Sequence, residues 1–219
     1  MIHFHIVTLF PESIEGYLNA SMMGRAQEKK KIKISYYNPK DFTAKKFDRV
    51  DRRPYGGGPG MVLEPEALLR AATKAIGKKK DVEVIFFTTV GEVFDEGMAV
   101  ELSAKKHIVF ICGHYEGVDA RVAEILKARH ITMGSYVLTG GELPAATMID
   151  AISRHVKGVL GKEESLEASR VSSPDVYTRP EVLMWKGKKY PVPEVLLSGH
   201  HAKIDEWKHA RRNKLNGHE

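Results

Sequence analysis

Residues 107–117 read His107-Ile108-Val109-Phe110-Ile111-Cys112-Gly113-His114-Tyr115-Glu116-Gly117. The first six residues are mostly apolar and have the length of a strand, and the next five begin and end with glycine, which is typical of a loop. A continuous apolar run, unlike an alternating one, indicates a strand that other elements cover on both faces. We therefore predict a buried strand that leads into a loop at residue 113.

Strand and helix patterns alternate on both sides of this stretch. Ile2, Phe4 and Ile6 alternate with His3 and His5, which predicts a strand with one buried face. Further strands are expected at residues 32–37, 82–88 and 131–138. Helices are expected at residues 11–19, 64–76, 95–104, 119–127 and 140–156. The alternation predicts an α/β fold with a mostly parallel sheet that helices cover on both faces.

The pattern changes after residue 160. Residues 161–176 are polar and predict a flexible linker, and irregular structure is expected to continue to Pro193. A basic helix is expected at residues 202–214. We therefore predict an α/β domain at residues 1–160, a linker at residues 161–176 and a small helical C-terminal domain at residues 177–219.

The composition is that of a globular protein. The chain has 219 residues, 42% of them hydrophobic and 28% charged, which excludes a disordered or fibrous class. Its single cysteine, Cys112, excludes an intrachain disulfide and a multi-cysteine zinc site, and its place in an apolar run predicts an inert core residue. His200, His201 and His209 lie in the basic C-terminal region and are expected to be exposed, so no metal site is predicted.

The sequence also bears on where the protein is expected to act. Its uncharged stretches are too short to cross a bilayer. The first ten residues lack the basic segment and the cleavage site of a signal peptide. We expect a soluble, reduced, cytoplasmic protein without a membrane partner.

Positive charge is concentrated in one segment. The 34 lysines and arginines exceed the 28 aspartates and glutamates, which gives a net charge of +6. Residues 25–53 contain eleven basic and four acidic side chains, so this segment carries the whole excess. Clustered positive charge suits a nucleic-acid backbone, because neutralised phosphates release counterions. A solvated face that maintains solubility is the alternative interpretation.

Three glycine-containing loops are candidates for a ligand site. The first, Gly56-Gly57-Gly58-Pro59-Gly60, lacks the Gly-Lys-Ser/Thr of a P-loop, and is either a tight turn or a backbone surface that a base can approach. The other two, residues 113–117 and 134–142, both follow apolar strands. Ligands bind beyond the carboxyl ends of strands in open α/β sheets, so these loops suit a purine, with Tyr115 or Tyr136 stacked on it.

Four long motifs resemble the bacterial tRNA (guanine-N1)-methyltransferases. They are VDRRPYGGGPGM at residues 50–61, CGHYEGVDAR at 112–121, YVLTGGELPA at 136–145 and YTRPEV at 177–182. Residues 193–201 match as well, and the motifs occur in the same order along nearly the whole chain. The resemblance implies a SPOUT-class fold whose C-terminal trefoil knot binds S-adenosylmethionine. It also implies a homodimer with active sites built from both subunits, and a tRNA substrate with guanine at position 37.

Two other functions remain as alternatives. One is a related SPOUT enzyme that methylates another RNA position, and the other is a catalytically silent RNA-binding homologue. The chain ends before the family's usual C-terminal helices, which implies a truncated tRNA-binding domain with a weaker grip on tRNA. Thr88-Thr89 also replaces a Ser-Pro pair that is common on the family's donor-binding strand.

The resemblance assigns residues to two binding sites. The methyl donor is expected to contact Thr88, Gly113, Tyr115, Glu116, Met133, Gly134, Ser135, Tyr136, Val137, Leu138, Gly140, Gly141 and Pro144. The tRNA is expected to contact Arg25, Asp51, Tyr55, Gly57, Gly58, Arg211 and Arg212. Lys45, Lys46 and Arg49 are further candidates for phosphate contacts.

Methylation of guanine N1 needs two further groups. A general base must remove the proton that N1 carries at neutral pH, and a cation should stabilise the charge that develops on O6. In the family, an arginine after the knot and an aspartate in the linker have these roles. Arg154 occupies the arginine position. The linker is shorter here, and we expect Glu167 to be the base, with Asp175 as the second candidate.

Overall fold

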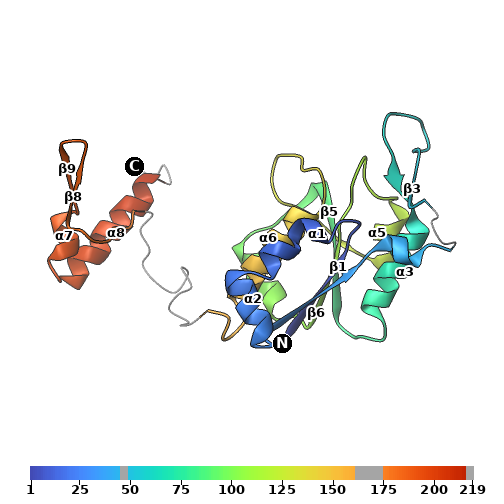
Figure 1. The fold of residues 1–219 in the computed structure, drawn as a ribbon, viewed down its shortest axis with the longest axis horizontal. Coiled ribbons are helices and arrows are strands. Elements are labelled where there is room, and N and C mark those ends of the chain that lie inside the picture. The colour runs from blue at the N-terminus through green and yellow to red at the C-terminus, as the bar shows by residue number, and fades with distance from the viewer. Residues whose placement is uncertain (45–48, 161–174, 216–219) are drawn as a thin grey trace. The chain divides into compact units, whose positions relative to one another are not determined.

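The structure, a computed structural model, describes residues 1–44, 49–160 and 175–215, with side chains up to Arg211 in the last range. The chain divides into two compact units, Met1–Gly161 and Lys162–Glu219 (Figure 1). Each unit is described by itself. Within the described ranges, no helix has both the length and the apolar character that a bilayer span requires.

The first unit is built on a five-stranded sheet (Figure 1). Its strands are β1 (Ile2–Val7), β2 (Ile32–Tyr37), β5 (Val82–Val93), β6 (His107–Ile111) and β7 (Arg129–Thr132). Their order across the sheet is β2-β1-β6-β5-β7, and all neighbouring strands are parallel. The parallel α/β sheet predicted from the sequence is therefore confirmed.

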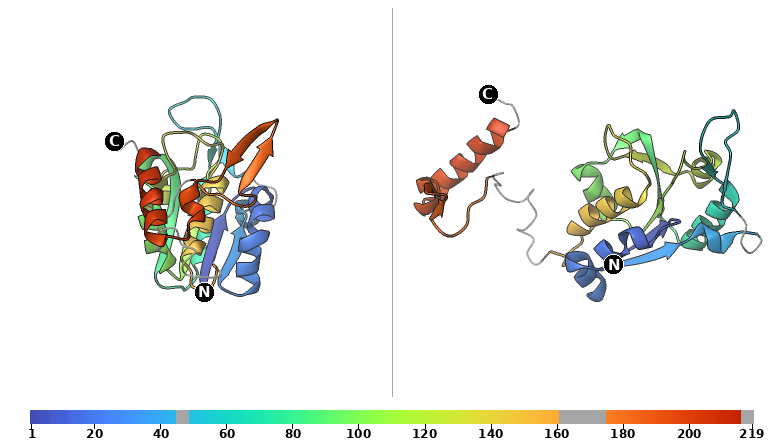
Figure 2. Two further views of the ribbon diagram at one scale, coloured as in Figure 1. Left: turned by 90° about the vertical axis from the view of Figure 1, so that its left-hand side faces the viewer. Right: turned by 45° about the horizontal axis from the view of Figure 1, so that its top comes forward.

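Helices cover both faces of this sheet (Figures 1 and 2). One face carries α1 (Glu12–Leu18), α2 (Ser21–Glu28), α4 (Glu96–Ser103) and α6 (Glu142–Arg154). Their apolar residues form one buried cluster with Phe4, Ile6 and Phe110 of the sheet. The other face carries α3 (Pro65–Ile76) and α5 (Arg121–Leu126). These two helices form a second cluster with Val7, Val109 and Ile111.

Strand β1 is buried on both faces, so the prediction of a half-buried strand was wrong. Phe4 and Ile6 belong to the cluster on the α6 side. His5 and Val7 point to the opposite face and are also completely buried. The alternation of apolar and polar residues in β1 therefore does not distinguish a buried face from an exposed one. Both faces are buried, and one of them contains a histidine.

Other elements differ from the prediction at their ends. Helix α2 was not predicted. Strand β5 continues to Val93, whereas β7 ends at Thr132, so residues 133–141 form a loop where an extended segment was expected. Two short antiparallel strands, β3 (Asp51–Arg52) and β4 (Val62–Leu63), hold the glycine-rich residues 53–61 between them, and a 3₁₀ helix, η1 (Pro39–Phe42), precedes them.

The second unit contains an antiparallel hairpin and two helices. Its elements are β8 (Val182–Trp185), β9 (Lys188–Pro191), α7 (Glu194–Leu197) and α8 (His201–Leu215). The hairpin overturns the expectation of irregular structure up to Pro193. Its two-residue turn, Lys186-Gly187, has positive φ at both residues, and this geometry matches the twist of paired strands. In α8, the ring of Trp207 lies 6.2 Å from that of Tyr177.

Candidate active site

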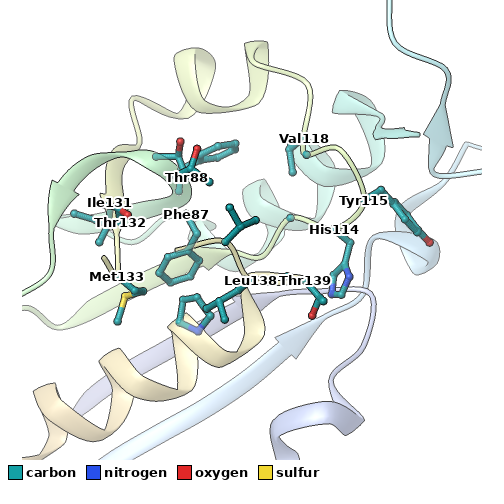
Figure 3. Close-up of a pocket in the computed structure, with 18 of the residues that line it drawn as sticks. Phe87, Thr88, His114, Tyr115, Val118, Ile131, Thr132, Met133, Leu138 and Thr139 are labelled. Carbon is teal, nitrogen blue, oxygen red and sulfur yellow. The ribbon is translucent and has the colours of Figure 1, made fainter. Parts of the chain in front are cut away.

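A cavity of about 430 Å³ lies beyond the carboxyl ends of β5, β6 and β7. This volume is within the usual range for small-molecule sites. Figure 3 shows Phe87 and Met133 on one side of the cavity and His114 and Tyr115 on the other. The loops after β6 and β7 supply most of the wall, because parallel strands deliver their following loops to the same edge of a sheet.

The cavity gathers most of the residues that were predicted to contact the methyl donor. All of them except Gly134 and Ser135 line it. The lining residues that the sequence analysis missed are Phe86, Phe87, Thr89, His114, Gly117, Val118, Ile131, Thr132 and Thr139. Most of these residues are direct sequence neighbours of predicted ones, so their position beside the motifs could have identified them. Contact with a donor remains a prediction for every one of the residues proposed.

Gly134 does not line the cavity, and it instead allows the conformation of the loop after β7. Its φ is +147°, and a Cβ added there would lie 2.8 Å from Cε1 of Tyr136. The Tyr136 hydroxyl donates a hydrogen bond of 3.2 Å to the carbonyl of Met133. The glycine therefore lets the Tyr136 ring fold back over the chain and position the loop.

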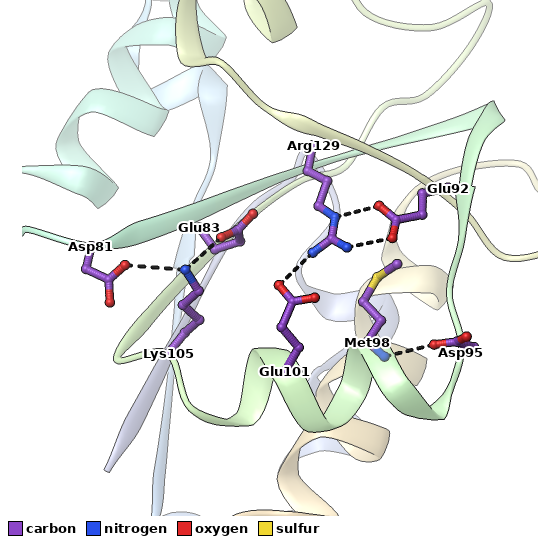
Figure 4. A network of polar contacts seen from close by, with 8 residues as sticks. All are labelled: Asp81, Glu83, Glu92, Asp95, Met98, Glu101, Lys105 and Arg129. Carbon is purple, nitrogen blue, oxygen red and sulfur yellow. Dashed lines mark hydrogen bonds and ion pairs between the residues drawn. The ribbon is translucent and has the colours of Figure 1, made fainter.

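A bulge in β5 forms another part of the wall. Phe87 and Glu92 both pair with Ile131, so residues 88–91 leave the ladder and bring Thr88 and Thr89 to the cavity. Beyond the bulge, Arg129 donates hydrogen bonds of 2.6 and 2.7 Å to Glu92 and one of 3.0 Å to Glu101 (Figure 4). The hydrogen bonds to Arg129 lower the pKa of Glu92. The bulge is thus fixed at its base by a bidentate ion pair.

Two of the cavity's loops are fastened to each other. The Gly141 amide donates a 3.0 Å hydrogen bond to the carbonyl of Gly113, and His114 and Gly140 form an isolated antiparallel bridge. A Cβ on Gly141 would lie only 2.6 Å from Cα of Cys112. Glycine is therefore required here by contact between two segments of the protein.

A buried carboxylate supports the same junction. Glu142, at the first turn of α6, is only 5% exposed. Its Oε1 accepts a hydrogen bond of 2.5 Å from the hydroxyl of Thr8, and its Oε2 lies 2.7 Å from Nε2 of His114. The ring of Phe10 meets that of His114 edge-on at 4.7 Å. The end of β1, the loop after β6 and the start of α6 are joined by one polar network.

Cys112 lies directly before the loop and is not part of this chemistry. Its side chain is buried, as predicted, and burial raises the pKa of its thiol. A thiol that stays protonated in an apolar environment is a poor nucleophile. Cys112 therefore contributes packing.

The glycine-rich segment between β3 and β4 adjoins the cavity loop. The amide of Glu116 donates a 3.0 Å hydrogen bond to the carbonyl of Met61, and a Cβ on Gly60 would lie 2.5 Å from Cγ of Glu116. Gly57 and Gly58 have φ values of +82° and +112°, with open space around them. Their backbone conformation favours glycine, and their surroundings leave the segment accessible to a ligand.

The residues predicted to contact tRNA lie on several elements. Arg25 is exposed on α2, Tyr55 is fully exposed between β3 and β4, and Asp51 on β3 lies 3.8 Å from Arg49. In the second unit, Arg211 lies 3.4 Å from Asp175 and 5.5 Å over the ring of Trp207. Lys45, Lys46 and the side chain of Arg212 fall outside the described residues. Contacts with tRNA remain predictions.

Of the three predicted catalytic residues, the structure places Arg154 alone relative to the cavity. Arg154 is the last residue of α6, whereas the cavity adjoins the first turn of that helix. Twelve residues of helix separate these ends by roughly 18 Å. Asp175 belongs to the second unit, and Glu167 falls outside the described residues.

A parallel α/β sheet with a ligand cavity enclosed by glycine-rich loops is typical of enzymes that bind nucleotide-like molecules. Among known families, the tRNA (Guanine-1)-methyltransferase TrmD family matches residues 2–217. The chain belongs to this family. It is 48% identical over 210 residues to the tRNA (guanine-N(1)-)-methyltransferase of Staphylococcus aureus strain Newman, which covers 94% of this chain and 84% of the relative. The same protein from strain Mu50 matches equally well.

Proposed function

We propose that this protein transfers a methyl group from S-adenosylmethionine to N1 of guanine at position 37 of tRNA. Its membership of the methyltransferase family, over nearly the whole chain, carries this proposal. The cavity at the strand ends provides the place for the donor, and the basic, exposed Arg25 and the open glycine segment provide surfaces for RNA.

The cavity suits the methyl donor chemically. S-adenosylmethionine supplies a methyl group on a positively charged sulfur, which needs no metal ion to activate it. Phe87, Met133 and Leu138 offer an apolar surface for the flat adenine ring, and the backbone of the glycine loops offers polar groups for its edge. Glu116 is the carboxylate among the lining residues and would attract the donor's positive charge.

The position of Arg154 supports a homodimer. A guanidinium that stabilises negative charge on guanine O6 must lie within hydrogen-bond reach of it. Arg154 is at the far end of α6 from the cavity of its own chain. We infer that a second subunit brings its Arg154 to this cavity, so that each active site uses residues of two chains.

The connection between β7 and α6 supports the trefoil knot expected for the family. Strand β7 is at the edge of the sheet and β5 separates it from β6. The chain nevertheless passes from β7 to the end of β6, where Gly141 bonds to Gly113 before α6 begins. A trefoil knot requires, in addition to this crossing, that the segment pass through a loop of the preceding chain.

Removal of the N1 proton is assigned to a carboxylate that follows α6. Glu167 is the first candidate and Asp175 the second. Asp175 lies 3.4 Å from Arg211, so in its present position it is paired with a cation. Removing a general base should lower the rate of methyl transfer by roughly 10²–10⁴ and leave donor affinity nearly unchanged. Single-turnover rates of Glu167→Gln and Asp175→Asn distinguish the two candidates.

A tRNA substrate agrees with a cytoplasmic location, and so does a chain whose single cysteine is unpaired. The basic segment at residues 25–53 gives the long-range attraction to RNA. In this assignment the second unit contributes Arg211 as a phosphate contact.

One assay tests the proposed reaction against both alternatives. Protein and labelled S-adenosylmethionine are incubated with unmodified tRNA carrying guanine at position 37, and the product is mapped by reverse transcription. Methylation at N1 blocks the Watson–Crick edge, so we expect a stop beside that guanine and none on a transcript with adenine in its place. A stop elsewhere would identify a related enzyme with another target. Donor binding without product would identify a silent RNA-binding homologue.

A further inference from the structure

Three histidines meet on the inner strands β1 and β6, toward the amino-terminal ends of these strands and away from the cavity. His3 and His5 lie two residues apart on β1 and therefore share a face. His107 begins β6 and pairs directly with His3. One ring nitrogen from each of the three lies within 4.8 Å of the others. His5 is completely buried, whereas His3 and His107 are partly exposed.

The spacing of two of these nitrogens suits a tetrahedral metal ion. Nε2 of His5 lies 3.3 Å from Nδ1 of His107. Two imidazole nitrogens that bind zinc at about 2.0–2.1 Å in a tetrahedral arrangement lie roughly 3.3–3.4 Å apart. The ring of His3 is 3.8 Å from that of His5, centroid to centroid, and one of its nitrogens lies within 4.8 Å of a nitrogen of each of the other two.

Hydrogen bonds orient the rings in the manner that a metal site needs. Nδ1 of His5 lies 3.1 Å from the hydroxyl of Tyr37, and Nε2 of His3 lies 2.8 Å from the hydroxyl of Ser35. A ring that donates a hydrogen bond from one nitrogen keeps a lone pair on the other. With these tautomers, His5 offers Nε2 and His3 offers Nδ1 to a metal ion. His107 donates its Nδ1 proton to Nε2 of His5, and it offers Nδ1 to the metal once that proton has moved to its own Nε2.

Nearby positive charge limits the affinity of the site. Lys33 and Lys79 lie close enough to the histidines to oppose a bound cation, and Nζ of Lys79 is held 2.8 Å from the carbonyl of Ala75 at the end of α3. Three nitrogen ligands with nearby lysines favour a site of moderate affinity whose remaining position accepts water or an anion.

We propose that His3, His5 and His107 bind a zinc ion, with the fourth coordination position open to solvent on the partly exposed side. The ion would join β1 to β6, two inner strands, toward the end of the sheet that lies away from the cavity. Its role is to stabilise the fold, since the ligands are far along the strands from the donor cavity.

The test compares metal binding by the wild type with that of the His107→Ala variant. Zn²⁺ is titrated into chelator-treated protein by calorimetry, and Co²⁺ is added separately to read its visible absorption. All proteins carry alanine at His200, His201, His209 and His218, which removes the histidine ligands of the second unit. We expect one stoichiometric site, an absorption band typical of tetrahedral Co²⁺, and a melting temperature that rises with Zn²⁺. His107→Ala should weaken Zn²⁺ binding at least tenfold and abolish the band.

The matched control is His130→Ala, which removes an exposed histidine from β7 and should leave binding unchanged. Circular dichroism of His107→Ala and of His3→Ala checks that each variant is folded, and either folded variant is sufficient for the comparison. Equal Zn²⁺ affinity in the wild type and in a folded variant would overturn the proposal. An octahedral Co²⁺ spectrum, or the absence of stoichiometric binding by the wild type, would overturn it as well.

Discussion

At the scale of single residues, Gly141 has a role in the protein besides the donor contact predicted for it. A Cβ at this position would lie 2.6 Å from Cα of Cys112, so close contact between two segments of the protein itself requires glycine. The contact with the donor stays a prediction. If a substitution of Gly141 lowers donor affinity, displacement of the loop is therefore a sufficient explanation, and steric exclusion of the donor is not required.

We expect Gly141→Ala to lower the free energy of unfolding by about 1–3 kcal/mol, because the added methyl group overpacks a backbone contact. Equilibrium unfolding in urea measures this change. Gly16→Ala is the control, since Gly16 lies in α1 with open space around it and alanine favours a helix. Equal stability of Gly141→Ala and the wild type would show that the loops separate easily.

The buried histidines make stability depend on pH. The unfolded rings titrate near 6.5, whereas the folded pKa values are about 3 for His5 and about 4 for His3. Between these values the unfolded chain binds more protons, so stability is complete above pH 6.5 and falls as the pH drops toward 4. The pKa of His5 is lowered further by nearby positive charge on Lys79, His107 and Lys33. The hydroxyl of Tyr37 lies 3.1 Å from Nδ1 of His5 and orients its ring.

We expect the urea midpoint to fall steadily between pH 6.5 and 4, measured with a chelator present so that no metal contributes. The His3→Gln variant, which cannot charge, should show a shallower fall. The exposed His130→Gln variant should keep the slope of the wild type. Identical slopes in all three proteins would contradict the assignment.

At the scale of elements, strand β5 combines two roles that the sequence did not distinguish. Its first half is a ladder strand, and its bulge carries cavity residues before the chain rejoins β7. Period and apolar content predicted where β5 begins, since both are local. The bulge ends at Glu92, which forms a bidentate ion pair with Arg129. Arg129 is distant in sequence, and local patterns do not report such a partner.

We expect Arg129→Met to loosen the bulge and raise the dissociation constant for S-adenosylmethionine about two- to fivefold, in keeping with the modest strength of partly exposed ion pairs. Calorimetry measures the affinity. Lys105→Met is the matched control, because Lys105 pairs with Asp81 and Glu83 at the other end of β5 (Figure 4). If both variants bind the donor as the wild type does, the ion pair does not position the bulge.

Prediction from sequence succeeded where the signal was local or repeated. The five strands of the parallel sheet, the helices α3 to α6 and the loops around the cavity followed from apolar runs and glycine positions. The histidine cluster could not be predicted, because His3 and His5 have the alternation of an exposed face and His107 is a hundred residues away. The hairpin β8–β9 was missed because its turn is Lys186-Gly187, which is not among the commonest turn pairs.

At the scale of the whole molecule, the distance between the cavity and Arg154 makes the proposed dimer testable by mixing. Arg154→Ala should be inactive through loss of the guanidinium, and Leu138→Asp through a charge in the cavity wall. If each site uses a cavity from one chain and Arg154 from another, a mixed dimer regains one intact site. Random exchange should restore about one quarter of the wild-type activity.

Methyl transfer is measured after the two variants are unfolded together and refolded. Each variant refolded alone gives the background. A mixture that stays at this background, with mixed dimers demonstrated by differently tagged chains, would show that one chain supplies the whole site.

The junction of Gly141 with the end of β6 has a consequence for the order in which the chain acquires its structure. The hydrogen bond from Gly141 to Gly113 can form only once β6 and its following loop are in place, and α6 begins at the next residue. Until then the inner face of the first helices lacks Ala145, Met148, Ile149 and Ile152, which complete their buried cluster. A chain emerging from the ribosome therefore carries an uncovered apolar surface until residue 154 has left the ribosome. Truncation before that point should yield an aggregating product, with the last helix of the first unit acting as the final closure of its interior.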